Sequence, residues 1–170
     1  MYRLMAILLF AAVALAQAPA PLPEARQLTA LFGPAFRPQS GAAVLLADLD
    51  GDGSEDAVVV ATADDPLVDQ LRFQYKVIDP YHAAFGLADP KVTMGFNSQE
   101  HPRLLLIVHN WRSPRQKFAV VNLPFERVRL ARVAVKKKVV PALLAEDLAG
   151  ARSYLYWDGK RWRWREYSTD

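Results

Sequence analysis

The chain has 170 residues, a hydrophobic fraction of 52% and a formal net charge of +3 at pH 7. This length suits one domain with its own core, and a charge so close to balance argues against nucleic acid as a partner. Because the sequence contains no cysteine, disulfide bonds, lipid attachment to cysteine and thiol chemistry are excluded.

Residues 1–16 predict export. Arg3 provides a positive start, residues 4–16 form an apolar run, and Ala14 and Ala16 have the small side chains of a cleavage site. The apolar run is shorter than the ~20 residues that span a bilayer. We therefore expect a cleaved signal peptide, with an uncleaved anchor as the alternative, and a secreted or periplasmic protein without stable membrane insertion after cleavage.

A proline-rich spacer, residues 17–23, precedes the predicted domain, residues 24–170. The domain begins with apolar side chains at helical spacing over residues 24–32, between Pro23 and Gly33. We expect a short amphipathic helix here that covers one face or edge of a sheet.

Residues 41–63, GAAVLLADLDGDGSEDAVVVATA, contain two apolar runs around a short acidic stretch. Carboxylates this close repel one another unless water or a cation separates them. Oxygen ligands without Cys or His favour Ca²⁺, since Mg²⁺ prefers a tight octahedron that keeps several waters. We predict a strand, a cation-binding loop and a second strand, with a solvated acidic turn as the alternative. The aspartates concerned are Asp48, Asp50, Asp52 and Asp56.

The spacing within this stretch matches the start of a calcium-binding loop. With Asp48 as position 1, aspartates occupy positions 1, 3, 5 and 9, Gly53 occupies position 6 and Ser54 occupies position 7. Glycine at position 6 permits a sharp turn, and the residue at position 7 offers its backbone carbonyl. Position 12, where an EF-hand has glutamate, is Val59, so the loop is not an EF-hand.

The string DLDGDGSED at residues 48–56, followed by AVVV, resembles the calcium loop of FG-GAP or VCBS-type repeats, the modules of integrin-like β-propellers. The resemblance covers residues 42–62 in a single copy. A complete propeller is not expected, because that fold needs at least ~4 blades. The resemblance implies Ca²⁺ held between two strands by the side chains of Asp48, Asp50, Asp52 and Asp56 and by the carbonyl of Ser54.

Residues 70–78, QLRFQYKVI, alternate apolar and polar side chains and predict a half-buried strand. Residues 79–102 show no clear period, and long irregular passages in compact domains are often functional. This passage contains His82, Glu100 and His101. It is the candidate site of an alternative function, a small periplasmic enzyme of the hydrolase type.

Three further strands are expected after this passage. Residues 103–110 form a continuous apolar run that fits a strand buried on both faces, and residues 117–123 and 126–135 follow. His109, at the end of the first strand, is expected to be a satisfied core or edge residue. The lysines at 136–138 are expected to lie in water at a strand end rather than to bind nucleic acid or anionic lipid.

Residues 141–148, PALLAEDL, predict a second short helix, with Pro141 at its start and Gly150 as its stop. The segment can form two helical turns, and proline is favoured at the first helical position.

The C-terminus predicts a β-hairpin, because alternating runs flank Asp158 and Gly159, a pair typical of a two-residue type I′ turn. Such a hairpin places Trp157, Trp162 and Trp164 on one face, and tyrosines and arginines on the other. We expect the tryptophan face to close the core, with a sugar-stacking or aromatic ligand platform as the alternative. The predicted pairs are Trp157 with Lys160, Leu155 with Trp162, and Ser153 with Trp164.

Together these elements predict a single, mainly β domain with an antiparallel sheet of six to eight strands and one or two short helices. The motifs of serine hydrolases, zinc proteases and phosphate-binding loops do not occur in the sequence. The leading hypothesis is a secreted or periplasmic, calcium-binding β module without catalytic activity, which binds a protein or glycan partner.

Overall fold

Ten strands and three short helices make up the part of the chain that the computed structural model describes, residues 25–41, 43–87 and 103–168. The predicted signal peptide and spacer, and Glu100 and His101, lie outside these described residues. The strands form two sheets, of six and four strands. The prediction of a mainly β domain with short helices is therefore confirmed.

No helix among the described residues is both long enough and apolar enough to cross a membrane.

The larger sheet, called the central sheet below, has the strand order β1-β3-β5-β6-β4. β1 and β2 share one edge of β3, where they pair with residues 61–63 and residues 56–58. All neighbours are antiparallel except β4 and β6, which run parallel. The strands are β1 (Phe36–Pro38), β2 (Leu45–Ala47), β3 (Asp56–Ala63), β4 (Lys76–Ile78), β5 (Leu104–His109) and β6 (Gln116–Val120).

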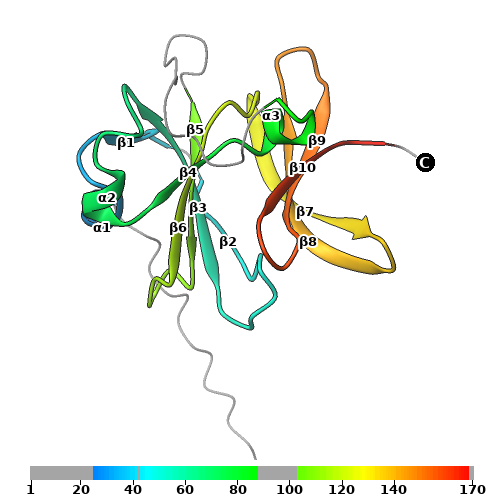
Figure 1. Ribbon diagram of the computed structural model, residues 1–170, viewed down its shortest axis with the longest axis horizontal. Helices are drawn as coiled ribbons and strands as arrows, with labels where there is room; N and C mark the ends of the chain where they lie inside the picture. Colours follow the sequence, from blue (N-terminus) through cyan, green and yellow to red (C-terminus); the bar gives the residue numbers. More distant parts are fainter. Residues whose placement is uncertain (1–24, 42, 88–102, 169–170) are drawn as a thin grey trace, which may run out of the picture.

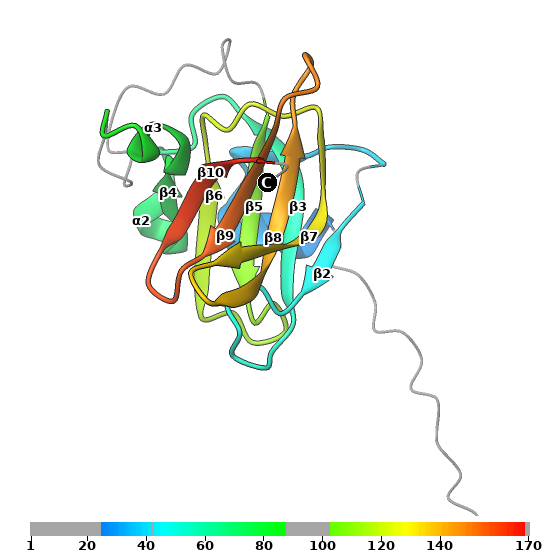
Figure 2. The same cartoon turned by 90° about the vertical axis from the view of Figure 1, so that its right-hand side faces the viewer.

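The smaller sheet, called the second sheet, is an antiparallel meander with the order β10-β9-β8-β7. Figure 2 views it from its outer side, in front of the central sheet. Its strands are β7 (Arg127–Val135), β8 (Lys138–Glu146), β9 (Arg152–Trp157) and β10 (Trp162–Glu166). The helices within the described residues are α1 (Ala25–Phe32), α2 (Gln70–Phe73) and α3 (Pro80–Ala84).

The central sheet is covered on both faces. In Figure 1, α1 and α2 lie on one side of it and the second sheet lies on the other. Successive side chains of a strand point to opposite faces, so a middle strand in this position needs apolar residues throughout. β5 meets this requirement, because all six of its residues are buried. The strand over residues 103–110, which was predicted to be buried on both faces, is confirmed as β5. The helix predicted over residues 24–32 is confirmed as α1.

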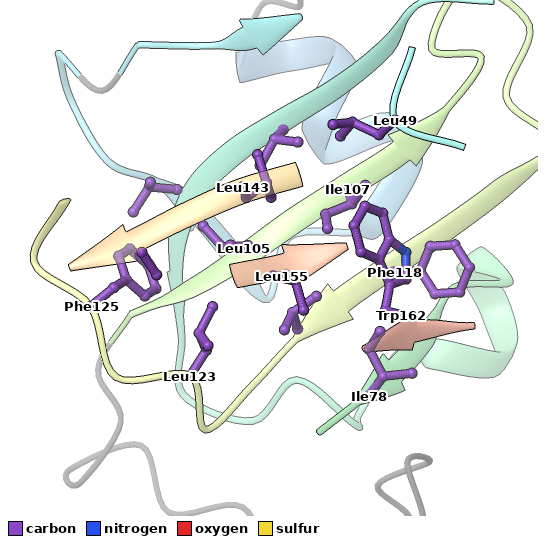
Figure 3. Close-up of a cluster of buried hydrophobic side chains, with 14 residues drawn as sticks. Leu49, Ile78, Leu105, Ile107, Phe118, Leu123, Phe125, Leu143, Leu155 and Trp162 are labelled. Atoms are coloured by element: carbon purple, nitrogen blue, oxygen red, sulfur yellow. The ribbon is translucent and has the colours of Figure 1, made fainter. Parts of the chain in front are cut away.

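The core between the two sheets is made by alternate residues of the central sheet. Leu105 and Ile107 of β5 pack there against Leu143 and Leu155 of the second sheet, and Figure 3 shows these side chains stacked across the interface. Trp162 of β10 belongs to the same buried cluster. The opposite face of β5 carries Leu104, Leu106 and Val108. These side chains belong to a second buried cluster with Leu28 and Phe32 of α1.

The segment predicted as a second helix, residues 141–148, is instead part of strand β8. Pro141 pairs with Arg132 of β7, and the pairing of β8 with β9 begins only at Ala142. Proline has no N–H to donate, so it is tolerated where a strand has a single neighbour. Pairing with two strands outweighed the helix propensity of the segment.

The segment predicted as one strand, residues 70–78, divides into α2 and β4. Gln74 adopts a left-handed conformation, with φ of 54°, which ends α2 and turns the chain before β4. Leu71 is consequently 90% exposed, although strand alternation predicted it to be buried. Residues 79–102 were expected to be irregular, and within their described part the five-residue helix α3 is present.

The C-terminal hairpin is present, but its register differs from the prediction by two residues. Trp162 pairs with Trp157, and Trp164 pairs with Leu155, around a loop of residues 158–161. Asp158 closes this wider loop, because its Oδ1 accepts hydrogen bonds from the backbone N–H groups of Lys160 and Arg161 at 3.0 Å each.

A shift of two residues leaves each side chain of the hairpin on its predicted face. Trp162 is buried between the sheets, and Trp157 and Trp164 are partly buried against the same cluster. The tryptophan face therefore closes the core, as predicted. The lysines at 136–138 are exposed at the turn between β7 and β8, which is also as expected.

Candidate metal site and neighbouring cleft

The acidic loop joins β2 to β3 at one end of the central sheet, and its first aspartate organises the backbone. Asp48 Oδ1 accepts hydrogen bonds from the N–H groups of Gly51 at 2.8 Å and Asp52 at 3.0 Å. Its Oδ2 accepts one from Gly53 at 3.0 Å. Gly51 and Gly53 have φ of 77° and 85°, a conformation that glycine adopts without strain. The predicted sharp turn at position 6 is therefore present.

Asp50 and Asp52 each use one carboxylate oxygen within the loop and direct the other toward a basic residue. Asp50 Oδ1 accepts from the N–H of Asp52 at 3.1 Å, and Asp52 Oδ1 accepts from the N–H of Ser54 at 2.7 Å. Asp50 Oδ2 lies 3.0 Å from His109 Nδ1, and Asp52 Oδ2 forms an ion pair with Arg115. The turn between β5 and β6 thus lies beside the loop.

Asp56, the first residue of β3, is fully buried. Its Oδ2 accepts hydrogen bonds from the N–H groups of Leu49 at 2.8 Å and Asp50 at 3.3 Å, and its Oδ1 accepts one from Asn110 at 2.8 Å. Burial raises the pKa of the Asp56 carboxyl, while these backbone donors act in the opposite direction. Asp56 therefore attaches the loop to the end of β5.

The structure brings the predicted ligands together in two groups rather than one. Asp48, Asp50 and Asp52 offer oxygen atoms within 4.8 Å of one another, and so do Asp50 and Asp56 together with a nitrogen of His109. Either group could hold a metal ion. Ser54, the predicted carbonyl ligand, lies in the same loop and donates its N–H to Asp52.

His109 is the residue at this site that sequence patterns missed. It is 1% exposed, as expected for a core residue, but neither ring nitrogen has a hydrogen-bond partner among the described residues. The expectation of a satisfied histidine was therefore wrong. Its Nδ1 lies 3.0 Å from Asp50 Oδ2. Burial lowers the pKa of the imidazole, and the nearby carboxylates of Asp56 and Asp50 oppose this shift.

Aromatic rings enclose the rest of the His109 side chain. The imidazole centroid lies 5.0 Å from the ring of Trp157, 5.2 Å from Phe118 and 5.6 Å from Trp162. His109 reaches the acidic loop because Ala57 of β3 pairs with Val108 of β5. No local sequence pattern predicts this pairing, since β3 ends at Ala63 and β5 begins only at Leu104.

A cleft of about 1190 Å³ opens beside the loop, between α3, the turn joining β7 to β8, and the hairpin of β9 and β10. Figures 1 and 2 both place α3 next to β10 at the edge of the second sheet. The aromatic part of its lining is Tyr156, Trp157, Trp162 and Trp164, the cationic part is Lys136, Lys137, Lys138, Arg161 and Arg163, and the acidic part is Asp50 and Asp158.

One of the two acidic residues of the cleft is already paired, because Asp158 Oδ2 accepts a hydrogen bond from Arg163 Nε at 2.6 Å. The other, Asp50, is a single carboxylate beside the buried His109. The cationic side chains therefore outweigh the available carboxylates. A cleft with this charge and with aromatic walls suits an anionic ligand that also has flat apolar surface.

The described part of the passage proposed as an enzyme site contains a second buried carboxylate. Asp79 accepts a hydrogen bond at Oδ1 from the N–H of His82 at 2.9 Å. Its Oδ2 lies 2.6 Å from His82 Nδ1 and accepts from Asn122 Nδ2 at 2.6 Å. Asp79 thus caps α3 and orients His82.

Comparison of the chain with known protein families, curated proteins and solved structures gave no match.

Proposed function

We propose that this chain is a secreted or periplasmic, calcium-stabilised β module without catalytic activity, which binds an acidic glycan. The observation that carries the proposal is the first acidic group, in which Asp48, Asp50 and Asp52 offer oxygens within 4.8 Å of one another on a single tight turn. Ca²⁺ takes its ligands from such oxygens and tolerates irregular geometry.

Repulsion within the loop favours a bound cation. Two carboxylates whose oxygens lie within 4.8 Å of each other repel by roughly 1 to 3 kcal/mol, depending on the water between them. Arg115 pairs with Asp52 and offsets one charge. With a Kd of about 0.1 mM, as in extracellular calcium modules, about 1 mM Ca²⁺ stabilises the folded state by roughly 1.4 kcal/mol.

The cleft supports the binding part of the proposal. The half-buried side chains of Trp157 and Trp164 line the cleft, and so do the exposed side chains of Lys137 and Lys138. Sugar rings with carboxylate or sulfate groups match this combination, because their C–H faces pack on aromatic rings and their anionic groups pair with lysine and arginine. A protein partner is the second possibility, and the binding experiment below separates the two.

The calcium part is tested by thermal unfolding of the purified protein in EDTA and in about 1 mM Ca²⁺. A stabilisation of roughly 1.4 kcal/mol corresponds to a rise in Tm of roughly 3 to 5 °C. Asp52→Asn removes a ligand and is expected to abolish most of this rise. Glu55→Gln is the matched control, because Glu55 lies in the same loop but outside both acidic groups. Equal Tm values in EDTA and Ca²⁺ for the unaltered protein would refute calcium binding.

The ligand part is tested by tryptophan fluorescence with a uronic-acid oligosaccharide and a neutral one of equal length. We expect a saturable change with the acidic oligosaccharide only. Replacing Lys137 and Lys138 by Gln is expected to weaken binding, whereas replacing Arg129 and Arg132 of β7, which do not line the cleft, is expected to leave it unchanged. If neither oligosaccharide binds while the protein captures acidic peptides, the glycan assignment is wrong and a protein partner is favoured.

The alternative function, an enzyme with its site in residues 79–102, has one observation in its favour. A buried aspartate beside a histidine Nδ1, as in Asp79 and His82, is the arrangement that orients a general base. The residues that α3 contributes to the cleft, however, are Pro80, Ala83 and Ala84 rather than His82. The same contacts account for Asp79 as the cap of α3. The non-catalytic module is therefore the better-supported function.

A further inference from the structure

The second acidic group differs from the first in chemistry and in burial. Asp56 and His109 are fully buried, and the Asp50 side chain is 15% exposed. Two carboxylates and one imidazole nitrogen lie within 4.8 Å of one another. Each comes from a different part of the fold: Asp50 from the loop, Asp56 from the start of β3 and His109 from the end of β5. The group is therefore held by the central sheet as well as by the loop.

His109 supplies an observation that is independent of the acidic cluster. It is buried, neither of its ring nitrogens is hydrogen-bonded among the described residues, and Nδ1 lies 3.0 Å from Asp50 Oδ2. A buried polar atom without a partner costs about 1 to 3 kcal/mol. When Nδ1 carries no proton, its lone pair also faces the carboxylate oxygen. A cation bound by His109 Nδ1 and by the Asp50 carboxylate oxygen gives the buried nitrogen a partner. It also removes the repulsion between the lone pairs of these two atoms.

The donor atoms select the kind of cation. Imidazole nitrogen is a common ligand of Zn²⁺ and other divalent transition metals, whereas Ca²⁺ takes oxygen ligands. One histidine and two carboxylates supply the three protein ligands that suffice for zinc sites with an open position.

The surroundings meet two further requirements of a metal site. The Asp56 carboxylate is oriented by the backbone N–H groups of Leu49 and Asn110, which serve as outer-shell hydrogen bonds. The rings of Trp157 and Phe118 fix the plane of His109. Asp50 also lines the cleft, so an ion has an access path from solvent.

We propose that Asp50, Asp56 and His109 form a binding site for a divalent transition metal ion, with Zn²⁺ as the expected occupant. This site goes beyond the calcium loop, because it lies on the inner side of that loop and depends on His109. Asp50 is shared between the two groups of ligands. The two sites are therefore coupled through one carboxylate but separable by mutation.

Isothermal titration of the purified protein with Zn²⁺ tests the proposal. We expect one Zn²⁺ to bind and His109→Phe to reduce the affinity by more than about 100-fold, beyond the loss of about 10- to 100-fold typical of an outer-shell change. Phenylalanine keeps a ring among Phe118, Trp157 and Trp162. The Tm rise with Ca²⁺ is expected to persist in His109→Phe. Asp52→Asn is expected to show the reverse pattern, with Zn²⁺ binding kept and the Ca²⁺ effect lost.

A measurement on the unaltered protein keeps the test decisive if His109→Phe does not fold. The chain has three histidines, and NMR spectra of their imidazole nitrogens identify which one binds Zn²⁺. A shift of the His109 Nδ1 resonance supports the site. A response confined to His82 or His101, or undiminished Zn²⁺ binding in a folded His109→Phe variant, overturns it. Neither outcome affects the calcium experiment, because that experiment measures Tm with Ca²⁺ and uses Asp52→Asn.

Discussion

Asp56 and Asn110 join two distant parts of the chain: the Asp56 carboxylate accepts a hydrogen bond from the backbone N–H of Asn110, 54 residues away, at 2.8 Å. The other carboxylate oxygen accepts N–H groups from Leu49 and Asp50. One buried side chain thus holds the acidic loop against the end of β5. Position 9 of the loop has a structural role whether or not an ion is bound.

Replacing Asp56 by Asn is expected to destabilise the protein strongly. The amide keeps one acceptor oxygen but turns an NH₂ group toward backbone donors, so at least one buried N–H loses its partner. We expect a loss of about 2 to 4 kcal/mol in the free energy of unfolding, measured by urea denaturation in EDTA. Asp52→Asn, on the exposed side of the loop, is expected to cost less than about 1 kcal/mol. Equal losses in the two variants would contradict this role for Asp56.

Lys117 is expected to stabilise the ends of two helices. Its Nζ donates to the carbonyl of Leu31 in α1 at 3.0 Å and to the carbonyl of Phe73 in α2. Carbonyls at helix C-termini lack intrahelical partners and attract cations. Lys117→Met should therefore lower the free energy of unfolding by about 1 to 3 kcal/mol. Lys138→Met, at the exposed turn, is the control and should have almost no effect.

Gly33 is expected to tolerate no side chain. It ends α1 with φ of +89°, and a Cβ atom would lie 2.6 Å from the ring of Phe73. Gly33→Ala combines backbone strain with displacement of that ring, for an expected cost of about 2 to 4 kcal/mol. Gly41→Ala has a similar φ of +74° but no neighbour within 4 Å, so it measures the backbone cost alone. Similar losses at the two positions would show that the ring moves freely.

Tyr75 is expected to make the fold sensitive to alkali. Burial raises the pKa of its hydroxyl to about 12, and the hydroxyl donates to the carbonyl of Pro66 at 2.8 Å. Because the folded state holds this proton more tightly than the unfolded state, its contribution is complete below about pH 10 and is lost as the pH rises toward about 12. Unfolding free energies measured across this range should fall more steeply for the unaltered protein than for Tyr75→Phe. Parallel curves would contradict the prediction.

Elements with a local pattern were predicted well. The helix α1 follows from apolar spacing between a proline and a glycine, and β5 follows from an unbroken apolar run, because each pattern is complete within its own segment. The same holds for the tight turn of the acidic loop, where Gly53 stands at the position that needs a positive φ. The faces of the C-terminal hairpin follow from the period of two, which a register shift of two residues preserves.

Neighbouring residues decide which segments carry apolar stripes, where the acidic loop lies and which hairpin face is aromatic, so these features follow from the sequence alone. The place of Pro141 in a strand and of His109 beside Asp50 became known from the folded chain. Both depend on pairing between segments distant in the chain, where the burial gained across a sheet outweighs local propensity.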